Sequence, residues 1–122
     1  MTENTIDDWA YRYKAKLDRV IDGDTVSLHV DLGFGIWRTM TVRMWGYNSP
    51  DLPDREGKRR ATDAIGQKLQ NVSLVLQTLR DRTDKYGGRY LGIVWVETRN
   101  VNDEMIKEGY GKPYLGHGPK PG

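Results

Sequence analysis

The chain has 122 residues, of which 19 are basic and 17 acidic, giving a formal net charge of +2. With 37% hydrophobic and 30% charged residues, it has the composition of one globular domain and not of a disordered or membrane-embedded chain. It contains no cysteine, which excludes disulfides, thiolate nucleophiles and cysteine metal sites. No basic or apolar leader opens the sequence, so we expect a cytoplasmic protein with no membrane partner.

Three segments near the start alternate apolar and polar residues, which predicts half-buried strands. They cover 11–17, 26–32 and 36–45. In the third segment the Met40–Val42–Met44 row should face the core, and Arg43 should point away from it.

A loop at 46–53, broken by Pro50 and Pro53, separates these strands from a helix. Apolar residues recur at helical spacing between 57 and 71, which predicts an amphipathic helix with Val72 on its apolar face. The remaining predicted elements are strands at 73–79 and 90–98, a short helix at 103–108, and an irregular tail from 111 onward.

Three meandering strands, a helix, two strands and a second helix follow the order of an OB-fold barrel. We therefore predict an α+β, mostly β fold, a five-stranded OB-fold barrel with two packed helices. The domain should occupy 11–114, between a flexible segment at 1–10 and an irregular tail at 115–122. A monomer is expected.

Several chemistries have no motif in this sequence. It lacks a Walker-type phosphate loop, a nucleophile elbow and a dinucleotide fingerprint, and its two histidines lie far apart in the sequence. What remains is three groups of oxygen ligands and arginines, at 22–25, 43–51 and 82–89. Each group taken singly is also typical of an ordinary turn or loop.

Four blocks of the sequence nevertheless occur in a specific order. They read VIDGDTVSLHVD, VRMWGYNSPD, RTDKYGGRYLGIV and VNDEMIKEGYGKPY. Together they resemble the staphylococcal nuclease, or thermonuclease-like, family over about residues 12–114. The resemblance implies an OB barrel with packed helices, in agreement with the pattern above, and a phosphodiesterase activity on nucleic acid. The family also includes members that bind without cutting.

The resemblance further implies a divalent-cation site, most simply for calcium. Its ligands would be the Asp24 carboxylate, the Asn48 side chain and the Ser49 backbone carbonyl. Asp51 would orient or deprotonate the attacking water. Active members carry aspartate at the position of Asn48 and glutamate at that of Asp51, so this site has less charge and a shorter carboxylate.

The arginines of the family pattern match Arg43 and Arg89, with one extra glycine, Gly88, in front of the second. Arginine suits this chemistry because a planar, permanently charged fork can meet the equatorial oxygens of a phosphate. Lys85 and Tyr86 match positions that contact the substrate.

The sequence therefore predicts a weak, metal-dependent nuclease that acts on single-stranded or double-stranded DNA or RNA. The alternative is a catalytically silent OB-fold module that binds nucleic acid or protein through the same face. A third reading is an assembly protein with a relic site. The basic run Lys58-Arg59-Arg60 at the start of the predicted helix is compatible with a polyanionic partner or with a solvated face.

Overall fold

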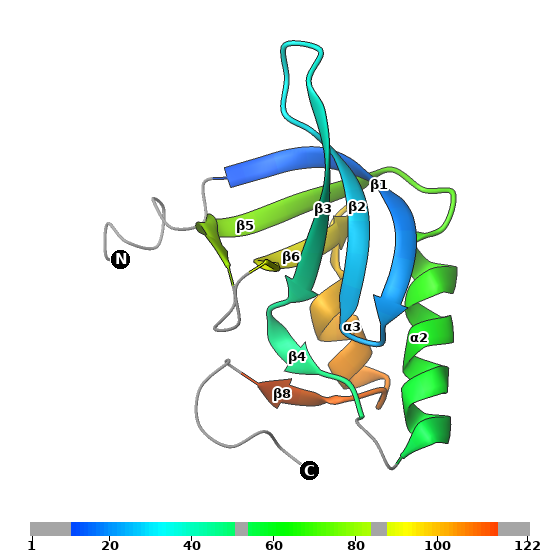
Figure 1. The fold of residues 1–122 in the computed structure, drawn as a ribbon. Helices are drawn as coiled ribbons and strands as arrows, with labels where there is room; N and C mark the ends of the chain where they lie inside the picture. Colours follow the sequence, from blue (N-terminus) through cyan, green and yellow to red (C-terminus); the bar gives the residue numbers. More distant parts are fainter. Residues whose placement is uncertain (1–10, 51–53, 84–87, 115–122) are drawn as a thin grey trace.

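A computed structural model describes residues 11–50, 54–83 and 88–114 (Figure 1). The segment predicted to be flexible, 1–10, and the tail predicted to be irregular, 115–122, lie outside the described residues.

Five strands close into a barrel. Their bounds are β1 Tyr11–Asp22, β2 Thr25–Asp31, β3 Trp37–Met44, β5 Leu74–Thr83 and β6 Tyr90–Val96. The sheet runs β3-β2-β1-β5-β6, and a parallel pairing of β3 with β6 joins its two ends (Figure 1). Closure removes the free edges that an open sheet would expose. The prediction of a five-stranded OB-type barrel is confirmed.

Two helices pack on the barrel, as predicted. The first, α2 Arg55–Leu69, begins before residue 57 because the Asp54 side chain accepts a hydrogen bond of 2.8 Å from the Gly57 amide and caps the helix. Its end at Leu69 leaves Val72 in the following turn, 38% exposed and not on the apolar face of the helix. The second helix is α3 Val101–Lys107, and Asn100 caps it in the same way.

A shared ion-pair group holds the two helices together. The Lys68 ammonium of α2 lies 3.1 Å from a carboxylate oxygen of Glu104 and 3.0 Å from one of Glu108. Burial alone would raise the pKa of Glu104, but hydrogen bonds from Lys68 and Arg99 hold it below its usual value. These contacts join the last turn of α2 to α3 and to the residue that follows it.

Two short pairings were not predicted. β4 Gly46–Asn48 pairs with β8 Lys112–Tyr114, and β7 Arg99–Asn100 pairs with β6. The first pairing contradicts the expected loop at 46–53 and the expected irregular chain after 111. Strands of three residues show no alternation that a sequence pattern could detect, and their stability comes from a partner more than sixty residues away.

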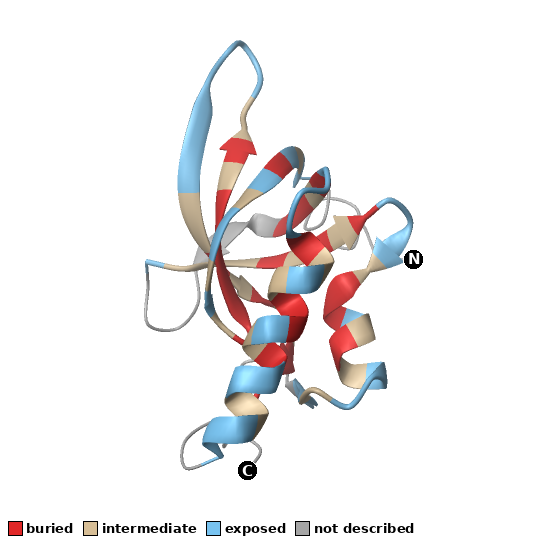
Figure 2. Ribbon diagram, turned by 90° about the vertical axis from the view of Figure 1, so that its right-hand side faces the viewer, coloured by how far each residue is buried: buried red, intermediate tan, exposed pale blue. Residues whose placement is uncertain are grey.

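The core follows the predicted alternation. Val26, Leu28 and Val30 are fully buried, as are Val42 and Met44, while Met40 is half-buried toward the open end of the barrel. Figure 2 shows that burial concentrates where the strands meet α2 and α3, whereas the tip of the β2–β3 hairpin is exposed. In the described part of the chain, no helix has both the length and the apolar character needed to span a bilayer.

Candidate functional site

A two-residue turn joins β1 to β2 and carries the first predicted site residue. Asp22 pairs with Thr25 across the turn, and the Asp22 side chain accepts a hydrogen bond of 2.7 Å from the Gly23 amide. A β-carbon on Gly23 would lie 2.7 Å from Ala61 Cβ and 2.8 Å from Ser49 Cβ. Glycine is therefore required here because the turn packs directly against α2 and against the chain that follows β4.

The Asp24 carboxylate fastens the β1–β2 turn to the chain that follows β4. Its Oδ2 accepts hydrogen bonds of 3.0 Å from both the amide and the hydroxyl of Ser49. Its Oδ1 accepts a hydrogen bond of 3.0 Å from the Thr25 hydroxyl. Asp24 is only 6% exposed, so these bonds replace the hydration that the charged group loses on burial.

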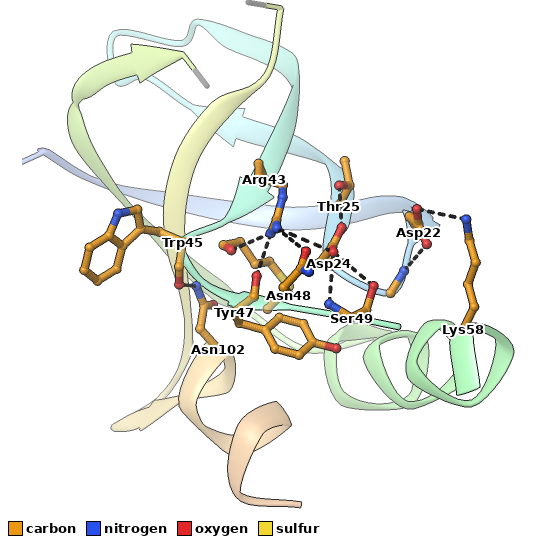
Figure 3. Close-up of polar contacts among 12 residues, drawn as sticks. Asp22, Asp24, Thr25, Arg43, Trp45, Tyr47, Asn48, Ser49, Lys58 and Asn102 are labelled. Carbon is orange, nitrogen blue, oxygen red and sulfur yellow. Dashed lines mark hydrogen bonds and ion pairs between the residues drawn. The ribbon is translucent and has the colours of Figure 1, made fainter. Parts of the chain in front are cut away.

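Arg43 reaches across from β3 into the same group. Its Nη1 donates to the backbone oxygens of Met44 at 2.8 Å and Tyr47 at 2.7 Å. Its Nη2 donates to Asn48 Oδ1 at 2.8 Å and lies 3.6 Å from Asp24 Oδ2. We call Asp24, Thr25, Arg43, Asn48 and Ser49 the polar cluster (Figure 3).

The structure brings together four of the residues that the sequence assigned to the site, namely Asp24, Arg43, Asn48 and Ser49. Arg89 lies directly before β6, the strand that runs parallel to β3 with Leu91 opposite Arg43. The other predicted site residues, Asp51, Lys85 and Tyr86, lie outside the described residues.

The polar cluster offers oxygen ligands, which a divalent cation prefers, but it carries only one carboxylate. Among the described residues, Asp24 Oδ1 and Asn48 Oδ1 each accept one hydrogen bond, which leaves each oxygen a second lone pair, and hard cations take oxygen ligands of this kind. Within the described ranges, however, no group of three or more acidic or histidine side chains converges on one point. Arg43 also balances the one carboxylate. These residues therefore suit a weakly held cation.

Three residues contribute to the site although the sequence predicted no role for them; two of them, Thr25 and Tyr47, lie within the groups at 22–25 and 43–51. Thr25 and the Tyr47 carbonyl belong to the hydrogen-bond network described above. Asn102 of α3 accepts a hydrogen bond from the Val94 amide and donates to the carbonyls of Trp45 and Gly92 at 2.8 and 3.0 Å (Figure 3). It thereby locks α3 to β6 and to the residue after β3. The sequence signal for Asn102 was its place in the block VNDEMIKEGYGKPY.

Asp54 and Glu56 are two further carboxylates that follow the site residues in the sequence. Asp54 is used as the cap of α2, where its side chain accepts from the Gly57 amide. Glu56 is exposed in the first turn of the same helix, where it offsets the cost of the basic residues beside it. Neither side chain has a contact with the polar cluster among the interactions of the described residues.

Tyr47 is fully buried, and its hydroxyl has no hydrogen-bond partner among the described residues. Burial and the nearby Asp24 carboxylate raise the pKa of this phenol, so it stays neutral. We expect Tyr47→Phe to raise the free energy of unfolding by about 1 kcal/mol, because an unsatisfied buried hydroxyl costs about that much or more. Urea unfolding measures it. A loss of more than about 1 kcal/mol would mean that the hydroxyl makes a stabilising bond.

Comparison with known proteins agrees with this geometry. The family described as staphylococcal nuclease homologue matches residues 41–120. Protein ParB of Escherichia coli is 32% identical over 119 residues, and Thermonuclease of Staphylococcus hyicus is 30% identical over 99 residues. An uncharacterised protein of Methanocaldococcus jannaschii, MJ1439, is 25% identical over 147 residues.

These alignments cover most of this chain and less of its relatives. They include 90% of the chain for ParB, 89% for MJ1439 and 77% for the thermonuclease. They span 62%, 68% and 55% of the lengths of those three proteins.

Proposed function

The chain belongs to the family of staphylococcal nuclease homologues, and on that premise we propose that it binds nucleic acid and slowly hydrolyses its phosphodiester bonds. The substrate is single-stranded or double-stranded DNA or RNA, and a divalent cation, most simply calcium, assists the reaction. The observation that carries the proposal is the convergence of Asp24, Arg43, Asn48 and Ser49 in one network from three separate segments.

The cation would be held by Asp24 Oδ1, Asn48 Oδ1 and the Ser49 carbonyl, with Asp51 acting directly or through water. A bound divalent cation polarises a phosphoryl oxygen and increases the acidity of a neighbouring water. Because Asn48 supplies a neutral oxygen where an aspartate would supply a charge, the affinity for the cation is low.

The arginines act on the phosphate. Negative charge grows on the equatorial oxygens during hydrolysis, and a guanidinium that is already in position stabilises it without reorganisation. Arg43 already donates hydrogen bonds to Asn48 and to two backbone carbonyls. A phosphate must therefore compete with these partners for Arg43, which is one reason to expect a slow reaction. Arg89 is the second arginine that would donate hydrogen bonds to the phosphate.

A second candidate is a binding module without catalysis. It is favoured by one observation, the hydrogen bonds and the ion pair that the polar cluster already makes within itself. Asp24 Oδ2 already accepts two hydrogen bonds, and the Arg43 charge faces it at 3.6 Å. A cluster of this type holds the chain after β4 in place even if it never receives a cation.

Cleavage of end-labelled single-stranded DNA and RNA, in calcium and in chelator, separates the two candidates. We expect slow cleavage in calcium, its loss in chelator, and its loss in Arg89→Ala but not in Lys107→Ala, which removes an exposed cation on α3. Binding of the strands without cleavage under either condition would establish the second candidate. A protein that neither binds nor cleaves would contradict both.

A further inference from the structure

The outer face of β1 carries a row of cations. Alternation along the strand turns Ala15 into the core and places Arg12, Lys14 and Lys16 on the solvent side, where all three are exposed. Successive outward positions of a strand lie about 6.6 Å apart. We call Arg12, Lys14 and Lys16 the β1 basic row.

Two tryptophans flank the β1 basic row. The Arg12 guanidinium lies 5.7 Å from the centre of the Trp95 ring, and the Lys16 ammonium lies 5.5 Å from that of Trp37. The Trp95 indole nitrogen donates to Gln77 Oε1 at 3.0 Å, which fixes the ring on the outer face of β6. Trp37 begins β3 and is 51% exposed.

The β2–β3 hairpin projects beyond the barrel (Figure 1) and adds an apolar side chain to this surface. At its tip Phe34 is fully exposed and adopts a positive φ of 58°, between Gly33 and Gly35, which also have positive φ. Hydrogen bonds from the Leu32 amide to Ile36 O at 2.8 Å and from the Ile36 amide to Gly33 O at 2.9 Å define the turn. An aromatic side chain held outward on a strained, hydrogen-bonded turn suggests a contact surface.

The surface ends at the next outward position of β1. Asp18 accepts a hydrogen bond of 2.9 Å from the Ser27 hydroxyl and lies 3.3 Å from His29 Nε2. At the tip, Asp31 accepts a hydrogen bond of 2.8 Å from the Gly33 amide. Among the described residues, these two carboxylates are thus engaged with β2 and with the turn, while the β1 basic row between the tryptophans is exposed.

We propose that the β1 basic row, with Trp37, Trp95 and Phe34, is a binding surface for single-stranded nucleic acid. Bases stack on the aromatic rings and phosphates pair with Arg12, Lys14 and Lys16, a combination that holds single strands without reading their sequence. Trp37 and Arg43 stand six residues apart on β3, about 20 Å, so this surface is separate from the polar cluster. The proposal rests on the proposed nucleic-acid binding and adds a second contact that cleavage does not require.

Fluorescence anisotropy with labelled oligothymidylate, in chelator, tests the surface without cleavage. We expect Trp37→Ala and Lys14→Gln each to weaken binding about fivefold to tenfold, as loss of a stacking contact or a phosphate contact does. Lys14→Gln should also reduce the slope of log affinity against log salt by about 0.7. Matched controls are Val72→Ala and Lys107→Gln, which remove an exposed apolar residue and an exposed cation elsewhere.

An abasic strand of the same length separates the two kinds of contact. It should remain sensitive to Lys14→Gln and lose its sensitivity to Trp37→Ala, since it offers phosphates without bases. If both variants bind like their controls while wild type binds well, the surface is wrong and nucleic-acid binding stands. If wild type does not bind at all, the surface and the proposed function both fail. Unchanged thermal unfolding of the variants shows that folding is not the cause.

Discussion

Arg43→Ala should lower the free energy of unfolding by about 3–5 kcal/mol, because it leaves Asp24 as a buried charge without a counter-ion. The same change removes the donor for two backbone carbonyls and for Asn48 Oδ1. Arg43 is only 13% exposed, so water replaces these contacts poorly. Urea or thermal unfolding in the absence of metal and nucleic acid measures the effect.

Arg38 of the same strand provides the matched control. It is exposed, and its guanidinium lies 5.8 Å from the centre of the Tyr90 ring, a contact whose loss in Arg38→Ala should cost about 1 kcal/mol or less. Arg43→Lys should fall between the two, because lysine restores the charge without the planar fork that bonds several oxygens at once. Equal stabilities of Arg43→Ala and Arg38→Ala would show that the polar cluster does not anchor the fold.

Asn48→Asp should tighten calcium binding about tenfold, a change of about 1.4 kcal/mol. It adds a second carboxylate next to Asp24, and calcium affinity rises with the number of charged ligands. Without calcium the two carboxylates share Arg43, so the variant should be less stable than wild type and should be stabilised more strongly when calcium is added. Calorimetry and calcium-dependent unfolding measure the two effects.

Asn71→Asp is the control. Asn71 is exposed in the turn after α2, so the variant makes the same substitution at a position outside the polar cluster. Adding Asp51→Glu to Asn48→Asp should raise the cleavage rate more than the two separate effects predict, because both groups order the same water. An Asn48→Asp protein that binds calcium no better than Asn71→Asp would exclude the polar cluster as the cation site.

The strands and the first helix could be predicted because the pattern that indicates each of them lies within its own segment of the sequence. Alternation in β1, β2 and β3 and helical spacing around Ile65 each follow from which side chains face the core. The β4–β8 pairing could not be predicted, since three-residue strands depend on a distant partner and leave no pattern of their own. The start of α2 lies before the predicted residue 57 for a different, local reason, because the Asp54 side chain caps the helix.

The proximity of four residues was predictable, and the bonds that join them were not. Four ordered sequence blocks identified Asp24, Arg43, Asn48 and Ser49, which the structure brings together. The resemblance predicts that Asp24 is a metal ligand, and this stays a prediction. The structure shows Asp24 as the acceptor that fastens Ser49 and faces Arg43. These contacts depend on distances between segments, and no residue type or spacing encodes them.

The most direct test of the polar cluster as a functional site is a calcium titration followed by backbone amide chemical shifts. We expect saturable shifts at Asp24, Asn48 and Ser49 at high calcium concentration, and their loss in Asp24→Asn, which preserves the shape of the side chain. Calcium-dependent shifts confined to acidic residues elsewhere, with none at these three amides in wild type, would contradict this expectation.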